Sequence, residues 1–132
     1  SLDPIAVTDG GIALNLSYPI IIHNQDGNIF GGGGGGVGPH GGICGGGGQG
    51  FSGGLKGIVI PTSSCSDGSY AAPGNQSSGG RSGGFFGEQG EYVDSYGTHI
   101  GGAGGAAIEK NGNIVRFANG NDGTHVKGDQ NN

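Results

Sequence analysis

The sequence of 132 residues contains no methionine and no tryptophan, and only five of its residues are lysine or arginine. With ten acidic residues the net charge is −5. This charge opposes any binding mode that depends on neutralising phosphates, so we expect no nucleic-acid partner. A glycine-rich RNA-binding tail would repeat Arg-Gly-Gly units, whereas Arg81 stands alone among the glycines around it.

Long apolar runs are also missing. No stretch approaches 18 apolar residues and no basic segment precedes a short apolar one, so we expect neither membrane insertion nor a secretory signal. Leu, Ile, Val and Phe make up about a fifth of the chain, which is at the lower limit for building a core. Helix formers are scarce, and we expect almost no helix. Because Ser1 stands where a Met would begin a chain, we expect a fragment or processed product of a longer protein.

Candidate sites for metals and catalysis are weak. The two cysteines, Cys44 and Cys65, fit no zinc or thioredoxin spacing and form either one disulfide or two buried thiols. The histidines lie in different segments with no Asp or Glu at ligand spacing, and residues 119–123 resemble a turn more than a calcium loop. We expect no metal and no cofactor.

Residues 50–54 match the Gly-x-Ser-x-Gly pattern that exposes a nucleophilic serine in some hydrolases. That chemistry needs a strand before Ser52, a helix after it, and a histidine and an acid elsewhere. Neither flank of the pattern fits, so we expect the protein not to be an enzyme.

Glycine is what the sequence has in excess, with 37 residues. Collagen is excluded because residues 31–36 are an unbroken glycine run and there are only five prolines. A disordered linker would lack the Ile-rich strands and Asn-Gly turns that flank the tracts. Glycine segments in the polyproline II conformation can pack side by side and hydrogen-bond laterally. We predict a mostly β and irregular fold, in which short strands flank a polyproline II glycine bundle.

The chain divides into three predicted parts. Residues 1–30 are a β lead-in, residues 31–105 are a glycine scaffold with inserts at 58–78 and 85–98, and residues 106–132 are a C-terminal segment of strands and turns. The alternation of Ile12, Leu14 and Leu16 with small or polar residues predicts one strand. Further strands are expected at Ile20-Ile21-Ile22, Ile29-Phe30 and Ile114-Val115-Arg116-Phe117. Asp26-Gly27 and Asn111-Gly112 predict tight turns with positive φ at glycine. We expect residues 128–132 to fray.

The lead-in Ile20 to Phe30 that runs into the glycines, and the closing Gly101 to Ile108 followed by Asn111-Gly112-Asn113-Ile114, carry a resemblance over residues 12–118. They resemble the glycine-rich receptor-binding tips of tailed-phage fibres, of the lambda host-specificity type and more loosely of the T-even long-tail-fibre type. The resemblance implies an extracellular protein at the distal fibre tip of the virion, whose inserts contact a bacterial outer-membrane protein or lipopolysaccharide. Lambda-type fibres are trimers, and T-even adhesins are single chains.

The small number of apolar residues favours the trimer. We predict a homotrimer in which alternate strand residues bury against copies of themselves, namely Ile12, Leu14, Leu16, Ile20 and Ile22.

Recognition is expected in the inserts, because glycine has no side chain with which to discriminate. Tyrosine offers a large contact area at low entropic cost, and carboxylates accept hydrogen bonds from a receptor's Lys or Arg. The receptor-binding residues predicted on this basis are Asp67, Tyr70, Phe85, Phe86, Glu91, Tyr92, Asp94 and Tyr96. Local core packing is the alternative for Phe85 and Phe86, and also for the tyrosines. The alternative functions are an ice-binding polyproline II protein and a glycine-rich structural protein.

Overall fold

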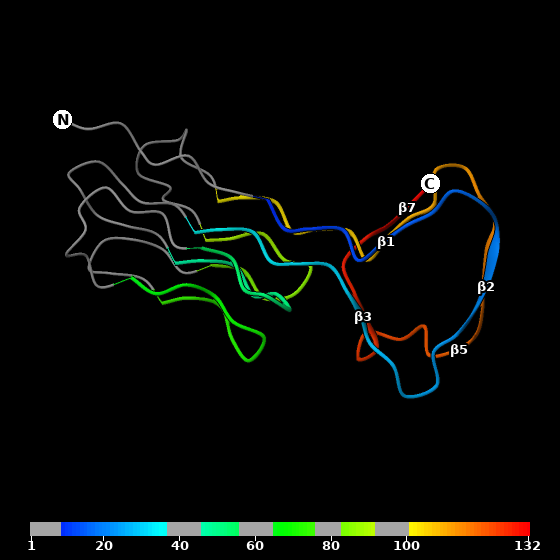
Figure 1. Ribbon diagram of the computed structural model, residues 1–132, viewed down its shortest axis with the longest axis horizontal. Helices are drawn as coiled ribbons and strands as arrows, with labels where there is room; N and C mark the ends of the chain where they lie inside the picture. The colour runs from blue at the N-terminus through cyan, green and yellow to red at the C-terminus, as the bar shows by residue number, and fades with distance from the viewer. Residues whose placement is uncertain (1–8, 37–45, 56–64, 76–82, 92–100) are drawn as a thin grey trace.

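The computed structural model describes residues 9–36, 46–55, 65–75, 83–91 and 101–132. These residues contain seven short strands and no helix, as predicted. The strands are β1 (Leu14–Asn15), β2 (Ile20–His23), β3 (Ile29–Phe30), β4 (Ile108–Glu109), β5 (Val115–Asn119), β6 (Val126–Lys127) and β7 (Gln130–Asn131). The strands and the turns between them form one part, the β unit, on the right of Figure 1. The other part is the glycine bundle, made of residues 9–11, 31–36, 46–55, 65–75, 83–91 and 101–105.

All strand pairs among the described residues are parallel. Three pairs join a strand from the N-terminal part of the chain to one from the C-terminal part, and the fourth joins two C-terminal strands. β4 lies between β1 and β7, while β2 pairs with β5 and β3 pairs with β6. The predicted Asn111-Gly112 turn is present, with φ of 52° and 80°. It does not close a hairpin, because β4 and β5 on either side of it pair with β1 and β2.

The core of the β unit lies between these paired strands. Ala107, Ile108 and Val126 are buried, and partly buried apolar side chains pack against them, namely Leu14, Leu16, Ile22, Ile29, Val115 and Phe117. Several residues expected to bury against other copies therefore pack within one chain. This removes the reason given for the homotrimer, and the oligomeric state stays a prediction that native mass spectrometry can test.

The C-terminal tail is ordered, so the prediction that residues 128–132 fray is wrong. Gln130 and Asn131 form β7, and the Lys110 N–H donates to the Asn131 carbonyl at 2.8 Å. The Asn131 side-chain amide also donates to Glu109 Oε1 at 2.7 Å. The tail pairs because β4 would otherwise leave backbone groups unpaired along its edge.

Gly27 is required for a different reason from the one predicted. Its φ is not positive, but a Cβ there would overlap the side-chain oxygen of Asn24. Asn24 is buried, and its amide donates to the Gly120 carbonyl at 2.9 Å. The Asn24 N–H donates in turn to Asn119 Oδ1 at 2.7 Å. Gly27 leaves room for a side chain that ties β2 to the turn after β5.

Lateral hydrogen bonds hold the glycine bundle together. Gly33 N–H donates to the Gln49 carbonyl at 2.7 Å, Gln49 N–H to Gly84 at 2.9 Å, and Gly84 N–H to Gly34 at 2.8 Å. A Cβ on Gly34 would overlap the backbone of Gly102. The segments therefore touch backbone to backbone, and bond laterally as the expected polyproline II packing requires.

The described part of the first predicted insert, residues 65–75, packs inside this bundle. Gly47 N–H donates to the Ser66 carbonyl at 3.1 Å, Gly68 N–H to Gly54 at 2.7 Å, and Gly74 N–H to Gly47 at 2.7 Å. Two isolated glycines, Gly68 and Gly74, thus have the same packing role as the glycine runs. The division of the chain into scaffold and inserts stays a prediction.

Candidate functional site

The glycine bundle has two ends with different chemistry. At the end nearer β3, the turn end, the chain reverses at residues 50–53, 69–72 and 85–88. Gly50 N–H donates to the Ser69 carbonyl at 3.2 Å, and Gly87 N–H donates to Gly31 at 2.7 Å, beside β3. The turns therefore lie at the end of the bundle that faces the β unit, and residues 85–88 contact the chain beside β3 (Figure 1).

At the opposite end, the far end, residues from several segments are hydrogen-bonded to one another. Gly36 N–H donates to the Gly46 carbonyl at 2.9 Å, Gly83 N–H to Gly74 at 3.3 Å, and Gly90 N–H to Gly102 at 2.9 Å. Glu91, which follows Gly90, is exposed at this end. The described residues that border segments 37–45, 76–82 and 92–100 are thereby gathered in one place.

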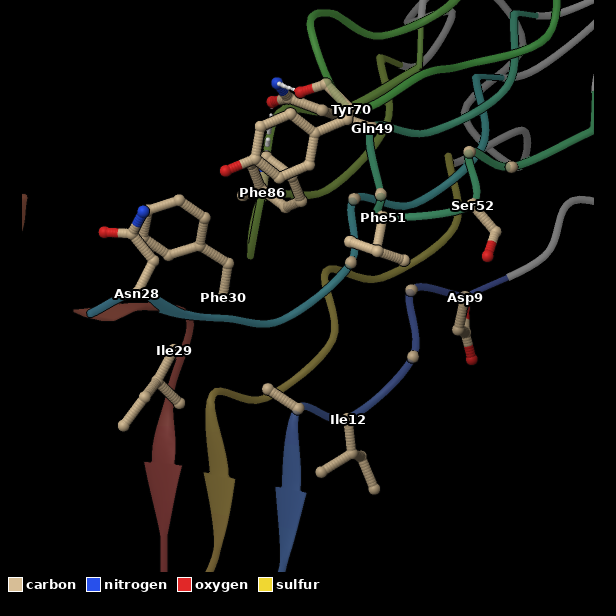
Figure 2. A pocket seen from close by; sticks show the side chains of 18 of the residues that line it. Asp9, Ile12, Asn28, Ile29, Phe30, Gln49, Phe51, Ser52, Tyr70 and Phe86 are labelled. Carbon is tan, nitrogen blue, oxygen red and sulfur yellow. Dashed lines mark hydrogen bonds between the residues drawn. The ribbon is translucent and has the colours of Figure 1, made fainter. Parts of the chain in front are cut away.

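A cavity of about 730 Å³ opens at the turn end, between the β unit and the turns of the bundle. Four aromatic rings form a row along it, shown in Figure 2. The ring centroids of Phe30 and Phe86 are 4.9 Å apart, those of Phe86 and Tyr70 are 5.6 Å apart, and those of Tyr70 and Phe51 are 6.3 Å apart. Phe86 is buried, whereas Tyr70 is 54% exposed and Phe51 is 90% exposed. The row therefore runs from the interior to the solvent.

Gln49 fixes the inner part of this row. Its side chain is buried; the amide nitrogen donates to the Tyr70 carbonyl at 2.9 Å, and the oxygen accepts the Phe86 N–H at 3.0 Å. Lys127 places its ammonium 4.9 Å from the centroid of the Phe30 ring, a cation–π geometry. The cavity wall is thus held by polar contacts behind it, which limits side-chain motion.

Polar side chains lie at both ends of the row. Figure 2 shows Asn28 beside Phe30, and Ser52 and Asp9 on the side of Phe51. Asp9 Oδ1 accepts the Ala103 N–H at 2.9 Å. The side chains of Asn28 and Ser52 make no hydrogen bond with the described residues, so both can bind a ligand.

The structure divides the predicted receptor-binding residues between these places. Tyr70, Phe85 and Phe86 lie at the turn end, Glu91 lies at the far end, and Asp67 is exposed within residues 65–75. Phe86 packs as local core, the alternative weighed for it, while Phe85 is 58% exposed. Tyr92, Asp94 and Tyr96 lie outside the described residues. The importance of Phe51 and Gln49 was missed, because an isolated residue in a glycine tract carries no pattern.

Cys65 is buried and disulfide-bonded, and no described cysteine is free. Cys44, the other cysteine of the sequence, lies outside the described residues. The predicted bridge between Cys44 and Cys65 therefore stays a prediction.

His125 is hydrogen-bonded to an acidic side chain. Its Nδ1 lies 2.9 Å and 3.0 Å from the two carboxylate oxygens of Asp122, three residues earlier. This hydrogen bond, with a further one from the Thr124 N–H, lowers the pKa of Asp122. The pair closes the turn before β6, since Val126 N–H also donates to the Asp122 carbonyl at 2.8 Å.

The oxygens of residues 119–123 bind the chain's own donors, as expected for a turn. Asn121 Oδ1 accepts the Gln130 amide at 2.6 Å, and Asn119 Oδ1 accepts the Asn24 N–H. In the described part of the chain, no cluster of three or more His, Cys, Asp or Glu could hold a metal ion. Nor do these residues include a helix that is long and apolar enough to span a membrane.

Comparison with known proteins decides the family. The sequence model of phage tail fibre adhesin Gp38 matches residues 4–130. The chain belongs to this family. Among solved structures, it is similar to a chain of the gp37-gp38 adhesin tip complex of the bacteriophage S16 long tail fibre, with 27% identity and a TM-score of 0.57. The match covers 94% of this chain and 52% of that chain, so this chain spans about half the length of its relative. No curated protein sequence matches.

Membership of this family of adhesins confirms the resemblance to phage fibre tips and the expected location at the distal tail fibre of the virion. The structural match is to a long tail fibre, the looser of the two resemblances noted in the sequence. The family is named for adhesion, in agreement with a binding protein rather than an enzyme.

Proposed function

We propose that the chain attaches a phage virion to a host bacterium by binding an outer-membrane protein or lipopolysaccharide at the far end of the glycine bundle. The observation that carries this proposal is the gathering of the residues that border segments 37–45, 76–82 and 92–100 at that end. The segments of the bundle contact one another backbone to backbone and offer few side chains. The side chains that discriminate between receptors must therefore come from the segments that the bundle carries at its far end.

Residues 91–96 are the strongest part of the predicted receptor-binding set. Tyr92 and Tyr96 supply aromatic rings, and Glu91 and Asp94 supply carboxylates. Glu91 lies at the far end, one residue after a glycine hydrogen-bonded in the bundle. A receptor loop with exposed Lys or Arg next to an apolar surface would match this combination, since charged pairs orient the contact and aromatic anchors supply affinity.

Adsorption of phage carrying Tyr92→Ala with Tyr96→Ala tests this proposal. Losing two central anchors should weaken binding by at least about thirtyfold. Phage carrying Tyr18→Ala is the matched control, because Tyr18 is 69% exposed on the β unit, away from the bundle. Normal adsorption of the double variant, with its fold intact by circular dichroism, would contradict the proposal.

A second measurement identifies the receptor class. Wild-type chain is applied to vesicles containing purified outer-membrane protein, and to vesicles containing lipopolysaccharide alone. Binding to only one of the two preparations assigns the receptor, and binding to neither, under conditions in which whole phage adsorbs, rejects both classes.

A further inference from the structure

We propose that the cavity at the turn end is a second binding site, which takes a neutral oligosaccharide of the bacterial surface. This inference goes beyond the proposed function, which places receptor attachment at the far end of the bundle. It rests on the aromatic row of Phe30, Phe86, Tyr70 and Phe51 and on the polar side chains at the two ends of that row.

The exposed half of the row has the form of a sugar platform. Phe51 is 90% exposed and Tyr70 is 54% exposed, and their rings meet edge to face at 83° with centroids 6.3 Å apart. An aromatic ring left in water is costly, and its electron-rich face attracts the polarised C–H bonds on the flat side of a pyranose. The two rings therefore offer contact to the apolar faces of sugar units.

Hydrogen-bonding groups flank the aromatic row at both ends, where the hydroxyls of a bound sugar would lie. Ser52 adjoins Phe51 in sequence, Asp9 lies on the same side, and Asn28 lies beside Phe30 (Figure 2). Asn28 and Ser52 make no side-chain hydrogen bond with the described part of the chain. Hydroxyl, amide and carboxylate groups around apolar rings match the alternation of C–H and O–H groups around a sugar.

Charge favours a neutral sugar over an anionic one. Among the described residues that line the cavity, Asp9 alone has an ionisable carboxylate or amine, and the whole chain carries −5. The Lys127 ammonium lies over the Phe30 ring but is not one of these lining residues. A phosphorylated or acidic sugar would be repelled by Asp9. A lipid chain would gain nothing from the polar groups at both ends, which it would have to desolvate.

The site is preorganised, which lowers the entropic cost of binding. The Gln49 side chain holds the backbone of Tyr70 and Phe86 through hydrogen bonds of 2.9 Å and 3.0 Å. Phe86 is buried against Phe30. The backbone that carries the inner rings, Tyr70 and Phe86, therefore does not have to order when the ligand arrives.

The test is binding of the wild-type chain and its variants to an array of neutral oligosaccharides released from lipopolysaccharide and from capsules, followed by calorimetry with the best binder. We expect Phe51→Ala to weaken binding by about thirtyfold, the effect of removing a central anchor. Tyr18→Ala is the matched control, because Tyr18 is an exposed aromatic residue that does not line this cavity. Asn28→Ala and Ser52→Ala should each weaken binding without affecting thermal stability.

Three results would overturn the proposal. The wild-type chain binds no oligosaccharide, Phe51→Ala and Tyr18→Ala lose affinity for the sugar equally, or Phe51→Ala loses binding to an outer-membrane protein and keeps its binding to the sugar. The array also separates the two sources, because lipopolysaccharide and capsular oligosaccharides are distinct spots. The variant with Tyr92→Ala and Tyr96→Ala should bind the oligosaccharide normally, so failure of this proposal can be told apart from failure of the far-end attachment.

Discussion

The side-chain oxygen of Gln49 accepts a hydrogen bond from the backbone N–H of Phe86, 37 residues further along the chain, at 3.0 Å. The amide nitrogen of the same side chain donates to the carbonyl of Tyr70 at 2.9 Å. One buried side chain thus joins three turns that lie far apart in the sequence. In a bundle built mainly of glycine, such a side chain adds specific contacts to the backbone hydrogen bonds between segments.

Replacing this residue gives the first prediction. Gln49→Leu keeps the approximate volume but leaves the Phe86 N–H and the Tyr70 carbonyl without their partner. We expect the free energy of unfolding to fall by about 2–4 kcal/mol, measured by urea denaturation. Gln89→Leu is the control, since Gln89 is exposed and makes one side-chain hydrogen bond, to the Gly101 carbonyl at 3.1 Å. Equal small losses in the two variants would show that Gln49 does not join the turns.

Two adjacent glycines give a second prediction. A Cβ at Gly10 would overlap the carbonyl of Gly32, whereas a Cβ at Gly11 meets no atom within 4 Å. We expect Gly10→Ala to lower the free energy of unfolding by about 2 kcal/mol or more through overpacking. Gly11→Ala should be neutral or stabilising by up to about 1 kcal/mol, because it restricts the unfolded chain. Thermal unfolding of both variants measures the difference, and similar melting temperatures would contradict the close packing described.

The Asp122–His125 pair predicts a pH dependence. The hydrogen bond from His125 lowers the pKa of Asp122 below its ordinary value of 3.8 in the folded chain. Because the folded pKa lies below the unfolded one, the stabilising contribution is fully present above the unfolded value and is lost as pH falls through the folded pKa. His125→Ala should return the pKa of Asp122 toward 3.8, as followed by the carboxyl carbon shift in NMR. His23→Ala is the control and should leave the Asp122 titration where it is in the wild type.

The cysteines give a further prediction. If Cys65 is bonded to Cys44, the native chain should contain no thiol that reacts with an alkylating reagent, even after unfolding without reductant. Replacing both by serine should lower the free energy of unfolding by about 3 kcal/mol, as expected for a loop of this length. Recovery of two alkylated cysteines from unreduced protein would rule the bridge out.

Local signals in the sequence predicted local structure well. The run Ile20-Ile21-Ile22 lies within β2, and Asn111-Gly112 forms the expected turn. Pairing was not predictable in the same way, since turn residues between two strands favour a hairpin, whereas here the strands pair in parallel with the other end of the chain. Register and partner depend on contacts that no short window of sequence contains.

The site was predicted only in part, for a related physical reason. Tyr70 and Phe86 stood out as aromatic residues, but sequence alone could not show that the bundle places them beside Phe51 and Phe30. Isolated glycines such as Gly68 and Gly74 belong to the bundle because backbone atoms of other residues lie directly against them. Glycine packing leaves no periodic pattern of apolar residues, which is the signal that usually reveals a core.

The pairing of β2 with β5 constrains how this protein can be made. The hydrogen bond from Asn24 to Asn119 spans 95 positions, and Leu14 of β1 pairs with Ile108 of β4, which is almost as far along the chain. During synthesis, the apolar residues of β1 and β2 have no native partner until β4 and β5, more than 90 residues further along the chain, have left the ribosome. Closing such long loops is slow, and the unpaired strands are exposed to aggregation and proteolysis in the meantime. Folding yield, rather than equilibrium stability, is therefore the property that should respond most to changes in the β unit.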